Sequence, residues 1–338
     1  MKFDVNISLD NLLEVPALAR EAEALGVDGL WTSETKRNPF FPLVLAAEHT
    51  QRVSLGTAIA VAFPRSPMIL AHEAWDLAEA SRGRFILGLG TQVKGHNERR
   101  FSVKWVSPGP RLREVVLALR AIWDCWQNGT PLNFRGEFYT FTLMTPFFNP
   151  GPIHYPKIPI YLAAINPYNC RLVGEVADGI QIHPFHSVKY LREGVLPHIE
   201  EGLQESGRSR EDVTLATSVL VVTGGSTREI EQERRSVKSQ IAFYASTRTY
   251  QPVLDVHGWG DVAARLHRKS VEGDWKGMAD LITDEMIEVY AVAGPLDEIA
   301  GRLRERYEGL VDRISPYLPW EAKGDRSLLT QLVKSFKQ

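Results

Sequence analysis

The chain has 338 residues, of which 44% are hydrophobic and 24% are charged, and this is the composition of an ordinary globular protein with a sizeable core. Its 39 lysines and arginines nearly balance its 41 acidic residues, so the formal charge is only −2. No broad electrostatic field would attract nucleic acid or an anionic membrane. We therefore expect a small-molecule partner.

The N-terminal residues MKFDVNISLD contain no apolar signal core, and nowhere do eighteen apolar residues run together. A soluble cytoplasmic protein is expected. The chain has two cysteines, Cys125 and Cys170, and each lies in a stretch with helical periodicity. We interpret them as two buried, unreactive thiols and expect neither a disulfide nor a metal site.

Apolar stretches rich in Val, Ile and Leu recur along the chain, and each is followed by a turn and an amphipathic stretch. Most lack strict alternation, as is typical of parallel strands covered on both faces. Eight strands are predicted, at residues 3–8, 29–34, 53–61, 84–91, 158–164, 179–183, 213–223 and 287–294. Apolar residues return every three or four positions in the stretches between them, for example at 12–26, 66–81 and 111–126.

Eight β/α units predict an α/β fold, a closed (β/α)₈ TIM barrel. We find no linker or internal repeat and expect a single domain over residues 1–338. Insertions are expected at about 92–108, 131–157 and 247–286, and residues 131–142 resemble a β-hairpin. Because catalytic residues of such barrels lie at the carboxyl ends of the strands, these ends are the candidate site.

The second predicted strand ends at Glu34. Its carboxylate can accept a hydrogen bond from a heterocycle or a substrate, or it can form a structural ion pair with Lys36, Arg37 or Arg65. The third strand carries a run of small residues around Ala58, which fits either a flat ligand lying against the backbone or ordinary barrel packing.

The fourth strand, RFILGLGTQV, contains Gly88 and Gly90, which weaken a strand interior. We interpret them as making room for a ligand. The hydroxyl, amide and backbone N–H groups that follow, with nearby cations, are typical of a pocket for a phosphate or a polyanionic tail. These residues are Thr91, Gln92, Val93, His96, Arg99 and Arg100. A Rossmann fingerprint is excluded, because no third glycine follows at the required spacing.

The fifth and sixth strands end in further candidates. Asn166 begins a predicted helix, where it can contribute to an anion site or simply cap the helix. His183 and His186 are three residues apart, but Pro184 lies between them and the segment is not helical, so we expect no metal. His183 is interpreted as a substrate-pocket or proton-transfer histidine, and a structural role is the alternative.

Taken in order, several segments resemble the luciferase-like monooxygenase superfamily, and in particular its deazaflavin (coenzyme F420)-dependent oxidoreductases. The matching segments are ALAREAEALGVDGLWTSE, RVSLGTAIAVAFPRSP, RGRFILGLGTQ, LVGEVADG and VAGPLDEIAGRLRERY, which together span nearly the whole chain. The resemblance implies a bacterial luciferase-like barrel that binds a tricyclic ring across its mouth. It also implies a homodimer.

The resemblance also implies roles for individual residues. In the family a non-proline cis peptide in the third strand contacts the ring, and the matching positions are Ala58 and Ile59. Glu34 stands where members have an acidic residue near the ring. The cofactor's phosphate-bearing tail is expected at Thr91, Gln92, Val93, Ala164, Ile165 and Asn166. Thr35 and Val93 replace a histidine and a glutamate of the sugar-phosphate-oxidising members, so glucose-phosphate chemistry is not expected.

The function that this predicts is hydride transfer between coenzyme F420 and a small organic substrate, either an alcohol or ketone or an activated alkene. Glu34, His183 and His96 are the candidates for proton transfer. Six aromatic residues are expected to line the substrate side, namely Trp31, Phe40, Phe63, Phe101, Trp105 and Phe185. Two alternatives remain: an FMN-dependent two-component monooxygenase and a non-catalytic flavin-binding protein.

Overall fold

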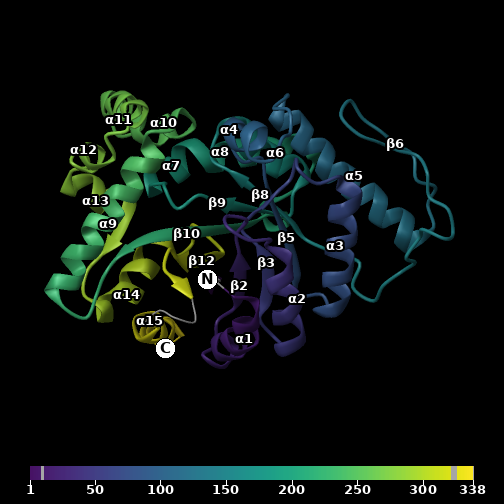
Figure 1. Cartoon of the computed structure of the whole chain (residues 1–338), viewed down its shortest axis with the longest axis horizontal. Helices are drawn as coiled ribbons and strands as arrows, with labels where there is room; N and C mark the ends of the chain where they lie inside the picture. The colour runs from purple at the N-terminus through teal and green to yellow at the C-terminus, as the bar shows by residue number, and fades with distance from the viewer. Residues whose placement is uncertain (9–10, 321–325, 338) are drawn as a thin grey trace.

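Eight parallel strands close into a barrel in the computed structural model of the chain, which describes residues 1–8, 11–320 and 326–337 (Figure 1). Each strand pairs with the next, and β12 pairs with β1 to complete the ring. The strands are β1 (Lys2–Ile7), β2 (Gly29–Thr32), β3 (Ser54–Thr57), β5 (Phe85–Gly90), β8 (Ile160–Ala164), β9 (Gly179–Ile182), β10 (Thr214–Val222) and β12 (Arg313–Pro316). The predicted (β/α)₈ barrel is confirmed.

Two strands differ from the prediction. The eighth barrel strand is β12, and the strand expected at 287–294 was wrong in position: α13 (Asp284–Tyr290) occupies its first half, capped by the Thr283 hydroxyl, which accepts from Met286 N–H. Only β11 (Ala291–Ala293) is extended there, and it extends the sheet from the carboxyl half of β10. The third strand is interrupted, and β4 (Ala60–Val61) continues it along β5.

Helices surround the barrel, as the apolar periodicity predicts. The long ones are α1 (Val15–Ala24), α2 (Phe40–His49), α3 (Pro67–Ala80), α5 (Pro108–Asn128), α6 (Pro167–Val176), α8 (Leu196–Ser206), α9 (Thr227–Ala245), α14 (Leu296–Tyr307) and α15 (Ser327–Lys337). Ser66 caps α3 by accepting from Met68 N–H, and α5 ends at Gly129, whose φ is +72°. Cys125 and Cys170 are free and buried, as expected.

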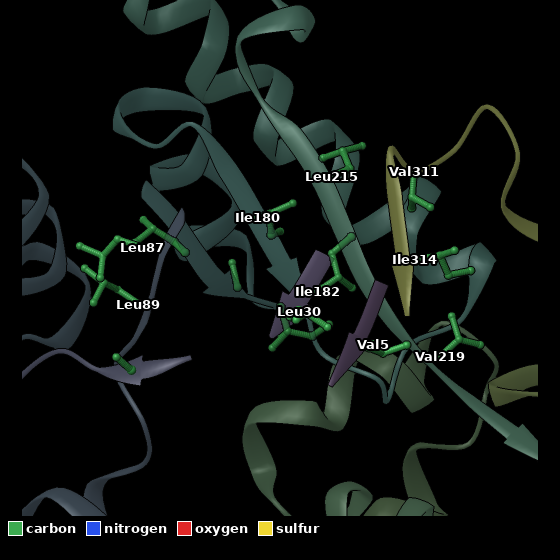
Figure 2. Packing of buried hydrophobic residues seen from close by; sticks show 14 of the residues in the cluster. Val5, Leu30, Leu87, Leu89, Ile180, Ile182, Leu215, Val219, Val311 and Ile314 are labelled. Atoms are coloured by element: carbon green, nitrogen blue, oxygen red, sulfur yellow. The ribbon is translucent and has the colours of Figure 1, made fainter. Parts of the chain in front are cut away.

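The hydrophobic core lies between the strands and these helices. Figure 2 shows outward-facing strand residues such as Val5, Leu30, Leu87, Ile180 and Ile314, all fully buried. Because side chains alternate along a strand, the residues between them point into the barrel. The strands are thus held from outside by apolar packing, which leaves the barrel interior for a different set of side chains.

A buried ion pair and an indole ring fill the barrel interior toward the amino ends of the strands. Arg313 donates to both carboxylate oxygens of Asp4 at 2.8 Å, and Trp31 Nε1 donates to the same carboxylate at 2.9 Å. Trp31 fits because Gly56 has no side chain: a Cβ there would lie 2.3 Å from the indole ring. Burial raises the pKa of Asp4, and Arg313 opposes that shift. This end of the barrel therefore has no room for a ligand.

The segments expected as insertions carry further helices and a hairpin. Residues 92–108 contain α4 (Lys94–Arg99), and residues 247–286 contain α10 (Gln251–Asp255), α11 (Gly260–Glu272) and α12 (Trp275–Ala279). The predicted hairpin is confirmed as β6 (Phe134–Arg135) and β7 (Thr140–Phe141), which projects at the right of Figure 1. Short elements complete the described chain, namely η1 (Leu12–Glu14), α7 (Val188–Tyr190), η2 (Leu191–Val195), η3 (Arg210–Asp212), η4 (Arg248–Tyr250) and β13 (Pro319–Trp320). Within the described ranges, every helix is too short or too polar to cross a bilayer.

Candidate active site

Small and polar side chains line the bottom of the opening at the carboxyl ends of the strands, which we call the mouth of the barrel. Asn6 Nδ2 donates to Ser315 Oγ at 3.2 Å, and Ser315 Oγ lies 2.8 Å from Ser218 Oγ, so these side chains meet across β1, β12 and β10. Gln181 and Ala163 occupy the equivalent inward positions of β9 and β8 by strand alternation. All of these except Ser315 are partly exposed although they lie on barrel strands, so the mouth is open to solvent.

The Ala58–Ile59 peptide is cis, as the resemblance predicts. Ala58 packs on the inner cluster that contains Trp31 and Tyr161, and its N–H donates to Thr32 O at 2.7 Å. Both Ala58 and Ile59 are partly exposed. This turn between β3 and β4 therefore forms part of the floor of the mouth.

Glu34 forms the ion pair that the sequence left open as an alternative. Its Oε2 accepts from Arg65 Nη1 and from Val61 N–H, both at 2.7 Å, and its Oε1 accepts from Arg65 Nη2 at 3.0 Å. The two side chains are 8% and 13% exposed. Glu34 N–H also donates to Ile59 O at 3.1 Å. Glu34 thus fastens the end of β2 to the turn that contains the cis peptide.

Gly88 and Gly90 accommodate the chain itself. A Cβ on Gly88 would lie 1.8 Å from the Thr57 carbonyl oxygen, and the Thr57 hydroxyl bonds both to Gly88 N–H and to Gly88 O. A Cβ on Gly90 would lie 2.8 Å from Ile59 Cδ1 and 3.2 Å from Ala163 Cβ. The interpretation that these glycines make room for a ligand was therefore wrong for Gly88, whose nearest neighbour is the backbone of β3.

The segment after β5 is held by its own side chains. Gln92 has a φ of +57°, its Oε1 accepts from Val93 N–H at 3.0 Å, and the Thr91 hydroxyl donates to Gln92 O at 3.0 Å. Buried Asn97 donates from Nδ2 to Thr91 O and Val93 O. Exposed basic side chains follow on α4 and directly after it, and we call them the basic cluster: Lys94, His96, Arg99 and Arg100.

At the end of β8, Asn166 caps α6: its Oδ1 accepts from Asn169 N–H at 2.9 Å. Ala164 and Ile165 have buried side chains, and Ile165 O accepts from the Tyr190 hydroxyl at 2.7 Å. Only their backbone can face the mouth. The inward side chain of β8 is Ala163 instead.

His183 lies at the end of β9 and is kept neutral. Its Nδ1 accepts from Phe185 N–H at 3.1 Å, which leaves Nε2 to carry the proton. Burial lowers the pKa of His183 to about 3, with a smaller effect from His186. The rings of Tyr244 and Tyr250 lie 4.6 Å away. His183 can donate a hydrogen bond from Nε2, but it carries no charge at neutral pH.

His186 is structural. Its Nδ1 lies 2.8 Å from His183 O and its Nε2 lies 3.1 Å from the Tyr307 hydroxyl. Burial lowers its pKa to about 4. The pair of histidines therefore holds the end of β9 against α14. Among the described residues, no three His, Cys, Asp or Glu side chains gather as they would around a metal ion.

The three predicted proton-transfer residues are not brought together. Glu34 is paired with Arg65, and His96 is exposed on α4. His183 lies among tyrosines at the end of β9, which is across the barrel from β2 and Glu34. No hydrogen bond joins any two of them, and all three are in the described part of the chain. The structure instead places Tyr244 and Tyr317 at the mouth, with hydroxyl oxygens 2.9 Å apart.

Four of the six aromatic residues expected to line the substrate side are buried, so this expectation was wrong for them: Phe40, Phe63 and Phe185 lie in the hydrophobic core, and Trp31 fills the barrel interior beside Asp4. Burial of large rings between strands and helices is the more favourable use of their surface. Phe101 and Trp105 are half-buried in the segment between α4 and α5. Trp105 packs edge-on against Phe63, with centroids 6.0 Å apart.

The mouth has features that fit a flat, anionic cofactor. Gln181 Nε2 is buried and has no hydrogen-bond partner in the described structure, so it is a free donor for a ring carbonyl. Ala58 and Ala163 present little bulk, and the basic cluster supplies positive charge beside β5.

A cavity of about 650 Å³ lies away from the mouth, between α7, α13 and α14, and none of the predicted site residues lines it.

Comparison with known proteins gives matches over nearly the whole chain. The family model for luciferase-like monooxygenases matches residues 3–313. An uncharacterized protein of Mycobacterium tuberculosis is 50% identical over 305 residues, which cover 88% of this chain and 90% of that protein. The 5,10-methylenetetrahydromethanopterin reductase of Archaeoglobus fulgidus is 27% identical over 349 residues, which cover 100% of both.

Among solved structures, the coenzyme F420 dependent tetrahydromethanopterin reductase from Methanopyrus kandleri superposes with a TM-score of 0.78. The match covers 100% of this chain and 98% of that chain at 22% identity, which shows a shared fold. With the family model matching from β1 to β12, the chain belongs to the luciferase-like monooxygenase family.

Proposed function

We propose that this protein is a coenzyme F420-dependent oxidoreductase that transfers a hydride between the deazaflavin and a small organic substrate. The observation that carries the proposal is the open mouth of the barrel, which is lined by small side chains and has one unpaired donor at Gln181 and the basic cluster on one side. The similarity to reductases, one of them F420-dependent, supports the choice of cofactor.

When bound, the deazaflavin would supply a hydride donor or acceptor at its central carbon. The protein's part is to bind, orient and manage one proton. Ala58, Ile59 and Ala163 would lie under the ring, and Gln181 Nε2 would donate to it. The Glu34–Arg65 pair would hold the Ala58–Ile59 turn in place, since it binds the neighbouring Val61 N–H.

The anionic tail of the cofactor would lie along the ends of β5 and β8. Backbone groups of Gln92, Val93, Ala164 and Ile165 would line this side, with Thr91 and Asn166 beside them. The basic cluster would supply the opposite charge. His183, being neutral, would donate a hydrogen bond from Nε2 and would not act as a charged acid. A proton-transfer role for His96 stays a prediction.

A fluorescence titration of the purified protein with F420 and, separately, with FMN tests this proposal. We expect micromolar or tighter binding of F420 and none of FMN. Ala163→Leu would place bulk on the floor and should weaken F420 binding at least 10-fold, about 1.4 kcal/mol. Ala264→Leu, an exposed position of α11, is the matched control and should bind normally.

Tight FMN binding without F420 binding would contradict the proposal and would favour the FMN-dependent monooxygenase. Binding of either cofactor without turnover of any alcohol, ketone or activated alkene would favour a non-catalytic flavin-binding protein. The expected homodimer stays a prediction, which sedimentation equilibrium tests.

A further inference from the structure

A pair of tyrosine hydroxyls stands at the β12 side of the barrel mouth. Arg313 and Ser315 both point into the barrel, because the first binds Asp4 and the second binds Asn6. Tyr317 is two residues after Ser315, so strand alternation points its side chain to the same inner face. Its N–H donates to Val219 O at 2.7 Å, which continues the pairing of β12 with β10. Its side chain is 38% exposed. Tyr317 therefore extends the inward face of β12 to the rim, where a ligand can reach it.

Tyr244 lies behind Tyr317. It is near the end of α9, its ring contacts His183 edge-on at 4.6 Å, and its hydroxyl oxygen lies 2.9 Å from that of Tyr317. Burial raises the pKa of Tyr244, and the neighbouring Tyr317 raises it further. Either hydroxyl can donate in this shared hydrogen bond, and when Tyr244 donates, the Tyr317 O–H is free to donate outward.

The other candidates at the mouth are committed elsewhere. Both carboxylate oxygens of Glu34 accept from Arg65, and His183 is neutral because burial lowers its pKa, while its Nδ1 accepts a backbone N–H. His96 is on α4, beside β5 rather than β12. Of the described residues considered above, Tyr317 combines a partly exposed hydroxyl with a hydrogen bond to a second hydroxyl, that of Tyr244.

We propose that Tyr317 is the catalytic proton donor to a carbonyl oxygen, that Tyr244 is its positioning residue, and that the substrate is therefore a ketone or the corresponding secondary alcohol. This rests on the proposed F420-dependent function. In the reducing direction, the carbonyl carbon would receive the hydride that a bound reduced deazaflavin supplies, and the proton that the cofactor loses on oxidation would go to solvent. The carbonyl oxygen takes the Tyr317 proton and becomes a hydroxyl. The Tyr244 O–H stabilises the resulting phenolate until solvent returns a proton to it.

A phenol suits this substrate better than an activated alkene. A carbonyl oxygen has lone pairs that accept an O–H hydrogen bond before the hydride arrives, so the donor is in place as the negative charge develops. An activated alkene takes its proton at carbon, which has no lone pair, and only the oxygen of its activating group can accept the phenol hydrogen bond. The proposal therefore takes the ketone of the two substrate classes that the sequence left open, and the activated alkene is the other outcome of the test.

Steady-state reduction of a panel of ketones and activated alkenes with reduced F420 tests the inference. Tyr317→Phe should lower kcat for ketones about 100-fold or more, in the range typical of a lost general acid. Tyr244→Phe should lower kcat about 10-fold with the KM for ketone unchanged, as expected for one hydrogen bond that strengthens as the phenolate forms. F420 affinity should be unchanged in both. The wild type should react more slowly in D₂O, and Tyr317→Phe should lose that difference.

Tyr250→Phe is the matched control, because this tyrosine lies in the same cluster and packs its ring on His183. Its activity should stay within about 2-fold of the wild type. If F420 binds and ketones are reduced, but Tyr317→Phe keeps activity and its isotope effect, the inference is overturned and the proposed function stands. Reduction of alkenes alone would also overturn it. Absence of F420 binding would refute the proposed function and this inference with it.

Discussion

Glu34→Gln separates a structural role of this residue from a catalytic one. The carboxylate accepts three hydrogen bonds, of which two come from the Arg65 guanidinium, and both side chains are nearly buried. The amide keeps the shape but removes the charge, and its NH₂ group faces a donor. Arg65 then keeps the Glu73 carboxylate, 3.7 Å from its Nε, and the Val61 carbonyl, which accepts from its Nη1 at 3.2 Å. Breaking a buried ion pair by changing one partner costs about 3 to 5 kcal/mol.

We therefore expect the free energy of unfolding to fall by about 3 kcal/mol, measured by urea denaturation monitored by circular dichroism. Glu48→Gln, at an exposed position of α2, should change it by less than about 0.5 kcal/mol. The double variant Glu34→Gln, Arg65→Met should recover part of the loss, because the more deeply buried Arg65 charge is no longer left without its main partner and only the half-buried Glu73 carboxylate loses its cation. Unchanged stability with a kcat reduced 100-fold or more would refute the structural assignment and favour Glu34 as a catalytic acid or base.

Other predictions concern packing, pH and salt. Gly88→Ala should prevent stable folding, since its Cβ would meet a backbone oxygen at 1.8 Å, whereas Gly301→Ala in α14, with open space around it, should stabilise by about 0.5 to 1 kcal/mol; thermal melts compare the two. The folded pKa of His186 is about 4, below its ordinary value, so the unfolded chain binds the extra proton and stability is lost as pH falls from about 6.5 to 4. His186→Gln should make the unfolding free energy less dependent on pH in this window, and an unchanged slope would contradict this. Lys94→Gln and Arg99→Gln should each weaken F420 binding a few-fold at low salt and less at high salt, because exposed charges are screened; equal effects at both salt concentrations would contradict an electrostatic role.

The barrel could be predicted because seven of its strands are apolar runs followed by amphipathic helices. The eighth strand, RISP, could not, because it is four residues long and contains an arginine. That arginine is buried only because Asp4, 309 residues away, pairs with it. The apolar run at 287–294 looked more like a strand, but the Thr283 cap starts a helix there.

The site was predictable where a residue's neighbours are close in sequence or matched the family. The positions of the cis peptide and the Asn166 cap are of this kind. The role of Gly88 could not be predicted, because the sequence looks the same whether a glycine makes room for a ligand or, as here, for the Thr57 carbonyl. Tyr317 was missed because it follows the strand that was missed. Tyr244 is in a helix, and only the fold brings it to the mouth.

The most direct test of the account is a single-turnover experiment without oxygen. The protein is mixed anaerobically with reduced F420 and a ketone, and the visible absorbance of the oxidised deazaflavin is followed. We predict that this absorbance appears at the rate at which the secondary alcohol forms, in a one-to-one ratio. Product that forms only when oxygen and reduced FMN are supplied, with no oxidation of F420 under nitrogen, would contradict the account.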